Sequence, residues 1–166
     1  MISRRIFTYV KPWLKQADLV LGDFEGTINP DYPLSGYPLF NAPQSVTAAI
    51  KDAGYDVMDL AHNHILDSGL EGAFTTADAF KKVGIDPIGV YEKPVRDKAP
   101  LLIKNVNGIK VAILSYAYGY NGLESNLTDK EVADHLSNLD EKRMKSENSA
   151  CRKRSGYHGY HASDGC

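Results

Sequence analysis

Residues 55–69 read YDVMDLAHNHILDSG, and the rest of the chain is organised around them. The apolar run at 55–61 predicts a strand, and the helix-compatible residues from Leu70 onward predict a helix after the motif. Two histidines, one asparagine and one aspartate lie between these elements. Because ligands of open α/β sheets bind at the carboxyl ends of strands, this position favours a binding site. A polar turn that caps the next helix is the alternative interpretation.

The chemistry of this motif lies in Asn63, His64 and Asp67. Imidazole nitrogen, amide oxygen and carboxylate oxygen together can form the shell of a divalent metal. Asp67 either orients His64 through a hydrogen bond or caps the following helix, and the sequence leaves both roles open. If the strand continues through the motif, His62 points to the opposite side from Asn63, and we expect a structural role for it.

The elements around the motif alternate between strands and helices, which predicts an α/β layer fold. Strands are expected at residues 18–23, 55–61, 85–90, 101–104 and 110–116, and helices at residues 6–14, 44–53, 70–83 and 128–145. The strand at 85–90 contains a proline, so we expect it near an edge of the sheet. The long loop that follows the first strand is rich in proline and glycine, and such loops are often functional.

Turn and cap residues define several of these boundaries. Gly54 ends the helix at 44–53, and the Asn107-Gly108 pair predicts a hairpin turn between two strands. Thr128, with Glu131 three residues later, forms a capping-box pattern at the start of the last helix. The acidic surface of that helix, at 129–147, is most simply a solvated face.

Composition excludes several classes of protein. The chain has 166 residues, 43% of them hydrophobic and 24% charged, which is typical of a globular protein with one real core. A net charge of -2 argues against a nucleic-acid partner. No apolar run approaches the length of a membrane span, and the basic start is interrupted by lysines, so we expect no signal or membrane segment in this chain.

The character of the sequence changes near Glu147. We therefore divide the chain into a domain at 1–146 and an anomalous tail at 147–166, which is either disordered or the product of a frameshift. Read one nucleotide forward, allowed codons for this tail give a charged helix end followed by an apolar strand. His158 and His161 lie in this tail, where we expect no functional role, and so do both cysteines, Cys151 and Cys166.

Residues 7–139 resemble the CapA family of capsule biosynthesis proteins, which is associated with poly-γ-glutamate synthesis. The matching motifs are ADLVLGDFEGTI at 17–28, GYDVMDLAHNHILDSG at 54–69, GIDPIG at 84–89 and GIKVAILSY at 108–116, in the family's order. The family resembles the calcineurin-like metallophosphoesterases, which implies an α/β fold of the metallophosphatase-like sandwich type. Its first Gly-Asp strand and its later histidine motif find no match, so we expect a domain that is incomplete at both ends.

This resemblance implies a site for divalent metal ions, with manganese, zinc or iron as the cofactor. The implied metal ligands are Glu25, Asn63 and His64, and the implied catalytic residues are His64 and Asp67. In hydrolases of this kind, paired cations hold the attacking and leaving oxygens. Asp23 alternates with Glu25 along the chain, so we expect one of the two to face the site, and Glu25 matches the family position.

The implied function is a role in capsule or poly-γ-glutamate biosynthesis on the extracytoplasmic face of the cell envelope. A metal-dependent hydrolysis suits the residues, with an anionic polymer or a phosphate ester as substrate and a membrane synthase complex as partner. This chain alone we expect to be an inactive fragment. Two alternatives stay open, a generic metallophosphoesterase acting on a small phosphate ester and a non-catalytic scaffold of the synthase complex. Tyr116, Tyr118 and Tyr120 either line a substrate cleft or serve packing.

Overall fold

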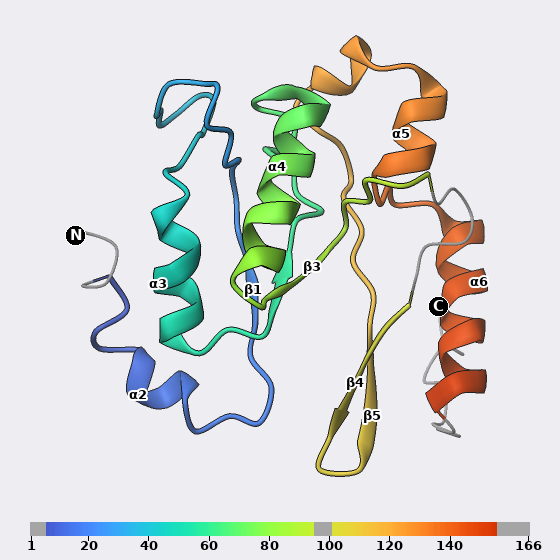
Figure 1. Ribbon diagram of the computed structural model, residues 1–166. Helices are drawn as coiled ribbons and strands as arrows, with labels where there is room; N and C mark the ends of the chain where they lie inside the picture. The colour runs from blue at the N-terminus through green and yellow to red at the C-terminus, as the bar shows by residue number, and fades with distance from the viewer. Residues whose placement is uncertain (1–5, 95–100, 156–166) are drawn as a thin grey trace, which may run out of the picture.

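The computed structural model describes residues 6–94 and 101–155 and shows a mixed α/β arrangement (Figure 1). The expected α/β class is therefore confirmed. β1 (Leu21–Asp23), β2 (Val57–Asp59) and β3 (Asp86–Ile88) form a parallel sheet in the order β1-β2-β3. The strand at 85–90 was expected near an edge, and β3 lies at an edge of this sheet.

Two helices connect these strands and cover the sheet. α3 (Ser45–Ala53) leads from β1 to β2, and α4 (Gly69–Lys82) leads from β2 to β3, as parallel pairing requires. Gly54 ends α3 in a left-handed conformation, with φ 116°, and its N–H bonds the carbonyls of the last turn. Figure 1 shows both helices beside the strands.

The core lies between this sheet and the helices. Met58 and Leu60 from the β2 region, Ile50 from α3 and Phe80 from α4 belong to one buried cluster. The helical spacing of apolar residues at 44–53 and 70–83 thus places their buried faces against the sheet. A side chain at Gly89 would collide with the backbone nitrogen of Ala61, so the chain needs glycine where β3 passes the end of β2.

A hairpin follows, as the Asn-Gly pair predicted. β4 (Leu102–Val106) and β5 (Ile109–Ile113) pair antiparallel, and Asn107 and Gly108 both have positive φ at the turn, 51° and 87°. These angles match the two-residue turn that follows the twist of paired strands. After β5, a loop leads to a short 3-10 helix, η2 (Leu123–Asn126).

The prediction of one helix from 128 to about 145 is wrong. α5 (Asp129–His135) begins with the expected capping box, in which Thr128 and Glu131 bond each other's backbone, but it ends at His135. The chain then runs extended, because Leu136 pairs with Val90 and Asn138 pairs with Ala117. A new helix, α6 (Glu141–Ser155), starts afterwards and lies beside β5 (Figure 1).

The expected change in character at residue 147 does not coincide with the end of an element. α6 continues through it to Ser155, so residues 147–155 of the expected tail are helical in the structure. Asp134, Arg143 and Glu147 are buried, which corrects the prediction that residues 129–147 are simply a solvated face, and Cys151 on α6 is buried as well. The remainder of the predicted tail, with His158, His161 and the shifted-frame strand, lies outside the described residues.

At the other end, α2 (Lys11–Leu14) is a single short turn of helix with Pro12 at its start. This agrees with the expected short helix at 6–14. No helix within the described ranges combines the length and apolar character needed to cross a bilayer.

Candidate functional site

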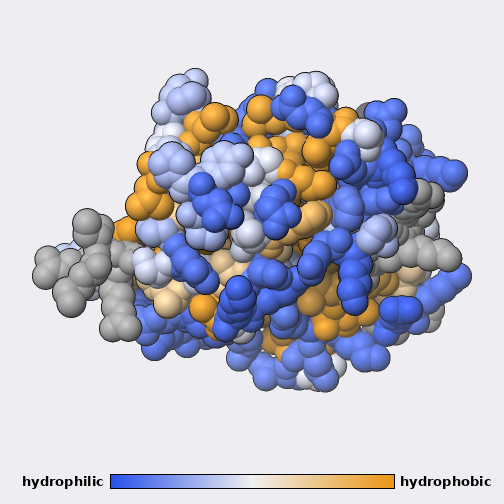
Figure 2. All heavy atoms as spheres, turned by 45° about the horizontal axis from the view of Figure 1, so that its top comes forward, coloured by the Kyte–Doolittle hydropathy of each residue, from blue (hydrophilic) through white to orange (hydrophobic). Residues whose placement is uncertain are grey.

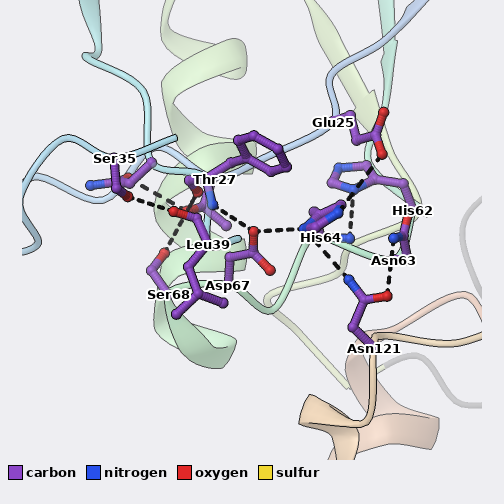
Figure 3. Close-up of polar contacts among 12 residues, drawn as sticks. Glu25, Thr27, Ser35, Leu39, His62, Asn63, His64, Asp67, Ser68 and Asn121 are labelled. Carbon is purple, nitrogen blue, oxygen red and sulfur yellow. Dashed lines mark hydrogen bonds and ion pairs between the residues drawn. The ribbon is translucent and has the colours of Figure 1, made fainter. Parts of the chain in front are cut away.

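The centre of the candidate site is an imidazole whose orientation is fixed by a buried carboxylate (Figure 3). His64 Nδ1 lies 2.8 Å from Asp67 Oδ2, and the Asp67 side chain is 1% exposed. The same carboxylate oxygen accepts the backbone N–H of Phe40 at 2.7 Å. Because a carboxylate only accepts hydrogen bonds, the proton of a neutral His64 belongs on Nδ1, and the lone pair belongs on Nε2.

Of the two roles that the sequence left open for Asp67, the geometry supports the orienting one. The residue at the N-cap of α4 is Ser68, and the Asp67 carboxylate bonds the imidazole and the distant Phe40 amide instead. The Phe40 ring packs edge-on against the imidazole, with ring centroids 4.7 Å apart. His64 is therefore held from two sides.

Glu25 approaches the free nitrogen of this imidazole. Its Oε1 lies 4.0 Å from His64 Nε2, a distance too long for a direct hydrogen bond. The Glu25 side chain is 58% exposed, so it reaches the site from the solvent side. The expectation that the segments after β1 and β2 bring Glu25 and His64 together is met, because parallel neighbouring strands end at the same edge of the sheet.

Asn63 joins the site through a residue that the sequence reasoning missed. Its side-chain amide donates to Asn121 Oδ1 at 3.1 Å, and the Asn63 oxygen has no hydrogen-bond partner among the described residues, so it can act as a ligand. Asn121 Nδ2 also lies 3.5 Å from His64 Nδ1, but that nitrogen donates to Asp67, so the contact is a close approach and not a second hydrogen bond. The Asn-Gly pair at 121–122 signals a turn, and nothing local signals a contact with Asn63.

His62 has the surroundings of a structural histidine, but β2 ends at Asp59, so the strand alternation from which its orientation was predicted does not reach it. It is buried, and its Nδ1 accepts the backbone N–H of His64 at 3.2 Å. The proton of the neutral ring therefore belongs on Nε2, which is buried and has no hydrogen-bond partner among the described residues. Burial, followed by the proximity of His64, lowers the pKa of His62 to about 4.

Asp23 lies opposite Asp59 in the parallel register of β1 and β2. Burial, followed by the negative charges of Asp59 and Glu25, raises the pKa of Asp23 above its ordinary value. Asp59 itself accepts the N–H of Ala61 at 2.8 Å and a short hydrogen bond from the Ser115 hydroxyl. These carboxylates add negative charge at the end of the sheet where Glu25 and His64 lie.

The long loop between β1 and α3 holds Phe40 in place. Asn41 is buried, and its side chain accepts the N–H of Asn29 and donates to the carbonyls of Asn29, Tyr32 and Pro33. The Thr27 hydroxyl donates to the Phe40 carbonyl at 2.8 Å and accepts from Ser68. This network fixes the backbone N–H of Phe40, which donates to Asp67. The long loop therefore contributes to the site by positioning Asp67.

The donor set suits part of a divalent-metal shell. His64 Nε2 carries a lone pair, the Glu25 carboxylate lies 4.0 Å away, and the Asn63 amide oxygen accepts no hydrogen bond from the part of the chain that the structure describes. The buried Asp67 behind His64 is the partner that a metal-binding histidine normally has. Within residues 6–94 and 101–155, however, no three side chains among His, Cys, Asp and Glu converge on one point that could hold an ion.

A cavity of about 610 Å³ opens beside Asn63. Its walls include Tyr116, Tyr118 and Tyr120, the residues for which the sequence allowed either a cleft or a packing role. Tyr120 is buried and Tyr118 is 97% exposed, so the three rings run from core to rim. All three line the cavity and Tyr120 also belongs to the core, whereas a role in a substrate cleft stays a prediction.

The chain is similar to known proteins over most of its length. A model of the family described as bacterial capsule synthesis protein PGA_cap matches residues 2–157. A capsule biosynthesis protein CapA of Bacillus anthracis is 31% identical over 137 residues, covering 80% of this chain and 33% of that protein. A PGA biosynthesis protein CapA of Bacillus subtilis (strain 168) is 28% identical over 114 residues, covering 67% of this chain and 30% of its own length.

A protein of Sinorhizobium fredii described as uncharacterized is 29% identical over 122 residues, covering 69% of this chain and 26% of that protein. The chain thus spans about a third or less of the length of the curated relatives it matches. The matched segment of this chain includes Glu25, Asn63, His64 and Asp67.

Proposed function

The chain belongs to the family of bacterial capsule synthesis proteins, and from that premise we propose that it carries part of a metal-dependent hydrolytic site used in capsule polymer production. The proposed substrate is an anionic polymer or a phosphate ester, with poly-γ-glutamate as the polymer suggested by the name of the Bacillus subtilis relative. The proposed place of action is the extracytoplasmic face of the cell envelope, within a membrane synthase complex.

One observation carries this proposal, namely the fixed imidazole of His64. Asp67 and Phe40 hold the ring from behind, so that Nε2 is the atom presented toward Glu25. A histidine constrained in this way can bind a cation or donate to a substrate oxygen without losing rotational freedom in the step. A histidine that only served packing would not need a buried carboxylate on the far nitrogen.

Glu25, Asn63 and His64 would hold a divalent ion of the manganese, zinc or iron class, and Asp67 would keep His64 in the correct tautomer. When bound, the ion supplies Lewis-acid polarisation of a phosphoryl or carbonyl oxygen. The chain's own residues orient the ligand atoms, and the Phe40 ring excludes water from one side of the imidazole. The neighbouring carboxylates Asp23 and Asp59 favour a cation at this end of the sheet.

Metal titration tests the proposal. Isothermal titration calorimetry with Mn²⁺ and Zn²⁺ is expected to show metal binding. His64→Ala should weaken this binding by at least about tenfold, because the imidazole ligand is lost. His135→Ala serves as the matched control, since His135 bonds the Tyr91 carbonyl away from the site. Equal metal affinity in the wild type and His64→Ala, with both folded by circular dichroism, would contradict the proposal.

A second candidate function, a non-catalytic scaffold of the synthase complex, is favoured by one surface feature. The loop that Asn41 orders exposes Tyr32, Leu34, Tyr37 and Leu39 to solvent. An ordered loop that presents several apolar side chains is suited to contact another protein. Figure 2 shows hydrophobic side chains between hydrophilic ones on one face of the molecule.

Restoration of polymer production in cells separates the two candidates. A hydrolytic role predicts that His64→Ala abolishes restoration, whereas replacement of Leu34 by Ser leaves it intact. A scaffold role predicts the opposite pattern. Leu34 is exposed, so its replacement leaves the core of the domain unchanged.

A further inference from the structure

The cavity beside Asn63 has no part in the hydrolytic step proposed for His64. It measures about 610 Å³, within the range of pockets that bind small ligands. Asn63 and Asn121, which bond each other, form the wall that it shares with the candidate site. A ligand that fills it would therefore lie directly beside the group held at His64.

The charge of the wall limits what this cavity can hold. Its described lining contains no lysine or arginine, and the one acidic side chain is Glu124. A carboxylate or phosphate placed here would meet this negative charge with no cationic side chain from the lining to balance it. The cavity therefore disfavours repeating carboxylates, such as those of a γ-glutamyl chain, and favours an uncharged polar group.

The wall offers two buried hydrogen-bonding atoms without partners among the described residues, an acceptor on Glu124 and the Nε2–H donor of His62. Glu124 Oε2 is buried and has no hydrogen-bond partner within the described residues. The Tyr116 and Tyr120 hydroxyls are already used, donating to Glu147 and Asn138 respectively, so these residues offer ring surface and not free hydroxyls. A wall of aromatic surface with an unsatisfied acceptor suits a ligand that has an apolar face and donates hydroxyl groups.

We propose that this cavity binds an uncharged, hydroxyl-bearing ring, of the kind found in a sugar, that is joined to the anionic group handled at His64. The position of the anionic group rests on the proposed function, whereas the chemistry of the cavity does not. A neighbouring cavity of about 890 Å³ shares Gly122 and Glu124 with this one and lies against α5. The second cavity is also lined by Lys142 and Arg143, so the preference for an uncharged ring is inferred for the cavity beside Asn63 alone, and the two together give room for an oligomer.

Binding of neutral and acidic oligomers tests the inference directly. The probes are a neutral trisaccharide, cellotriose, and tri-γ-glutamate, each titrated into the chain and followed by the NMR signals of the Asn63 and Asn121 side-chain amides. Cellotriose is expected to shift these signals and to bind more tightly than tri-γ-glutamate. Tighter binding of tri-γ-glutamate, or no shift with cellotriose, would overturn the inference.

Three variants locate the binding. Tyr118→Ala is expected to weaken cellotriose binding by about three- to tenfold, through loss of one aromatic contact. Glu124→Lys should weaken it by about tenfold or more, through loss of a charged acceptor. Tyr9→Ala, the matched control at another highly exposed tyrosine, should leave it unchanged. If Glu124→Lys instead strengthens cellotriose binding, the acceptor role of Glu124 is refuted.

Failure of this inference can be told apart from failure of the proposed function. His64→Ala removes the proposed metal ligand and leaves the tyrosine wall intact, so cellotriose binding should survive it. Metal binding that depends on His64 without any cellotriose binding would refute the cavity assignment alone. Cellotriose binding that Tyr118→Ala weakens, in a protein without His64-dependent metal binding, would refute the hydrolytic proposal alone.

Discussion

The buried His62 makes the stability of the fold depend on pH, and the direction follows from its surroundings. Its pKa falls from 6.5 in the unfolded chain to about 4 in the folded protein, chiefly through burial. Between these two pH values the unfolded chain binds a proton that the folded chain does not. The free energy of unfolding therefore decreases as the pH falls through this window, and the contribution is fully present above about pH 6.5.

The size of the effect follows from the shift. One pKa unit corresponds to about 1.4 kcal/mol, so the full drop corresponds to about 3 kcal/mol of stability lost between pH 6.5 and pH 4. His62→Gln removes the titration and keeps an acceptor for the N–H of His64. The variant should therefore lose about 3 kcal/mol less stability than the wild type over this window.

Urea unfolding followed by circular dichroism, at about pH 7 and about pH 4.5, measures the difference. Other titrating groups contribute equally to both proteins, so the difference between their pH dependences isolates His62. His135→Gln is the matched control at a second, partly buried histidine. Parallel pH dependences in the wild type and His62→Gln would refute the reasoning, because they would mean that His62 takes up its proton in the folded state.

Three further predictions concern side chains that hold the fold and the site. Asp67→Asn should lower the free energy of unfolding by about 1–3 kcal/mol and let the His64 ring populate both tautomers. ¹⁵N NMR of the imidazole detects the tautomers, and a single Nδ1–H tautomer in the variant would contradict the prediction. Phe80→Ala should lower the free energy of unfolding by about 3–5 kcal/mol, since the ring is 0% exposed and packs on Phe24. Urea unfolding measures this loss, and a value below about 1 kcal/mol would mean that the surrounding side chains close the cavity. Glu147→Gln should lower the free energy of unfolding by about 3 kcal/mol, because it leaves Arg143 buried without its ion pair. Wild-type stability of this variant in urea unfolding would disprove the importance of that pair.

Local signals in the sequence predicted most of the elements of this fold. Gly54, the Asn107-Gly108 pair and the Thr128 capping box act through backbone conformation and neighbouring atoms, so each could be identified without the rest of the chain. The end of α5 could not, because the residues after His135 leave the helix to pair with Val90 and Ala117. Those partners are separated from it by many residues, and no local pattern records them.

The candidate site divides in the same way. The meeting of Glu25 with His64 follows from strand order alone, since β1 and β2 are parallel neighbours. The contact of Asn121 with Asn63 arises 58 residues away along the chain, through a loop whose path depends on how β5 and η2 pack. The Phe40 amide on Asp67 likewise depends on the folded course of the long loop. Sequence patterns specify which groups an element presents, and packing decides which groups meet.

The Asn121-Gly122 turn is also a site where the protein is expected to deamidate slowly. An asparagine followed by glycine is the pair most readily attacked by its own backbone, with loss of ammonia, and asparagine is among the thermolabile residues. Here the product would place a carboxylate where an amide now accepts from Asn63, beside the cavity that disfavours negative charge. Because this change adds negative charge to the cavity wall and leaves the buried core untouched, fresh and incubated preparations of one batch should differ in ligand affinity while unfolding at the same urea concentration.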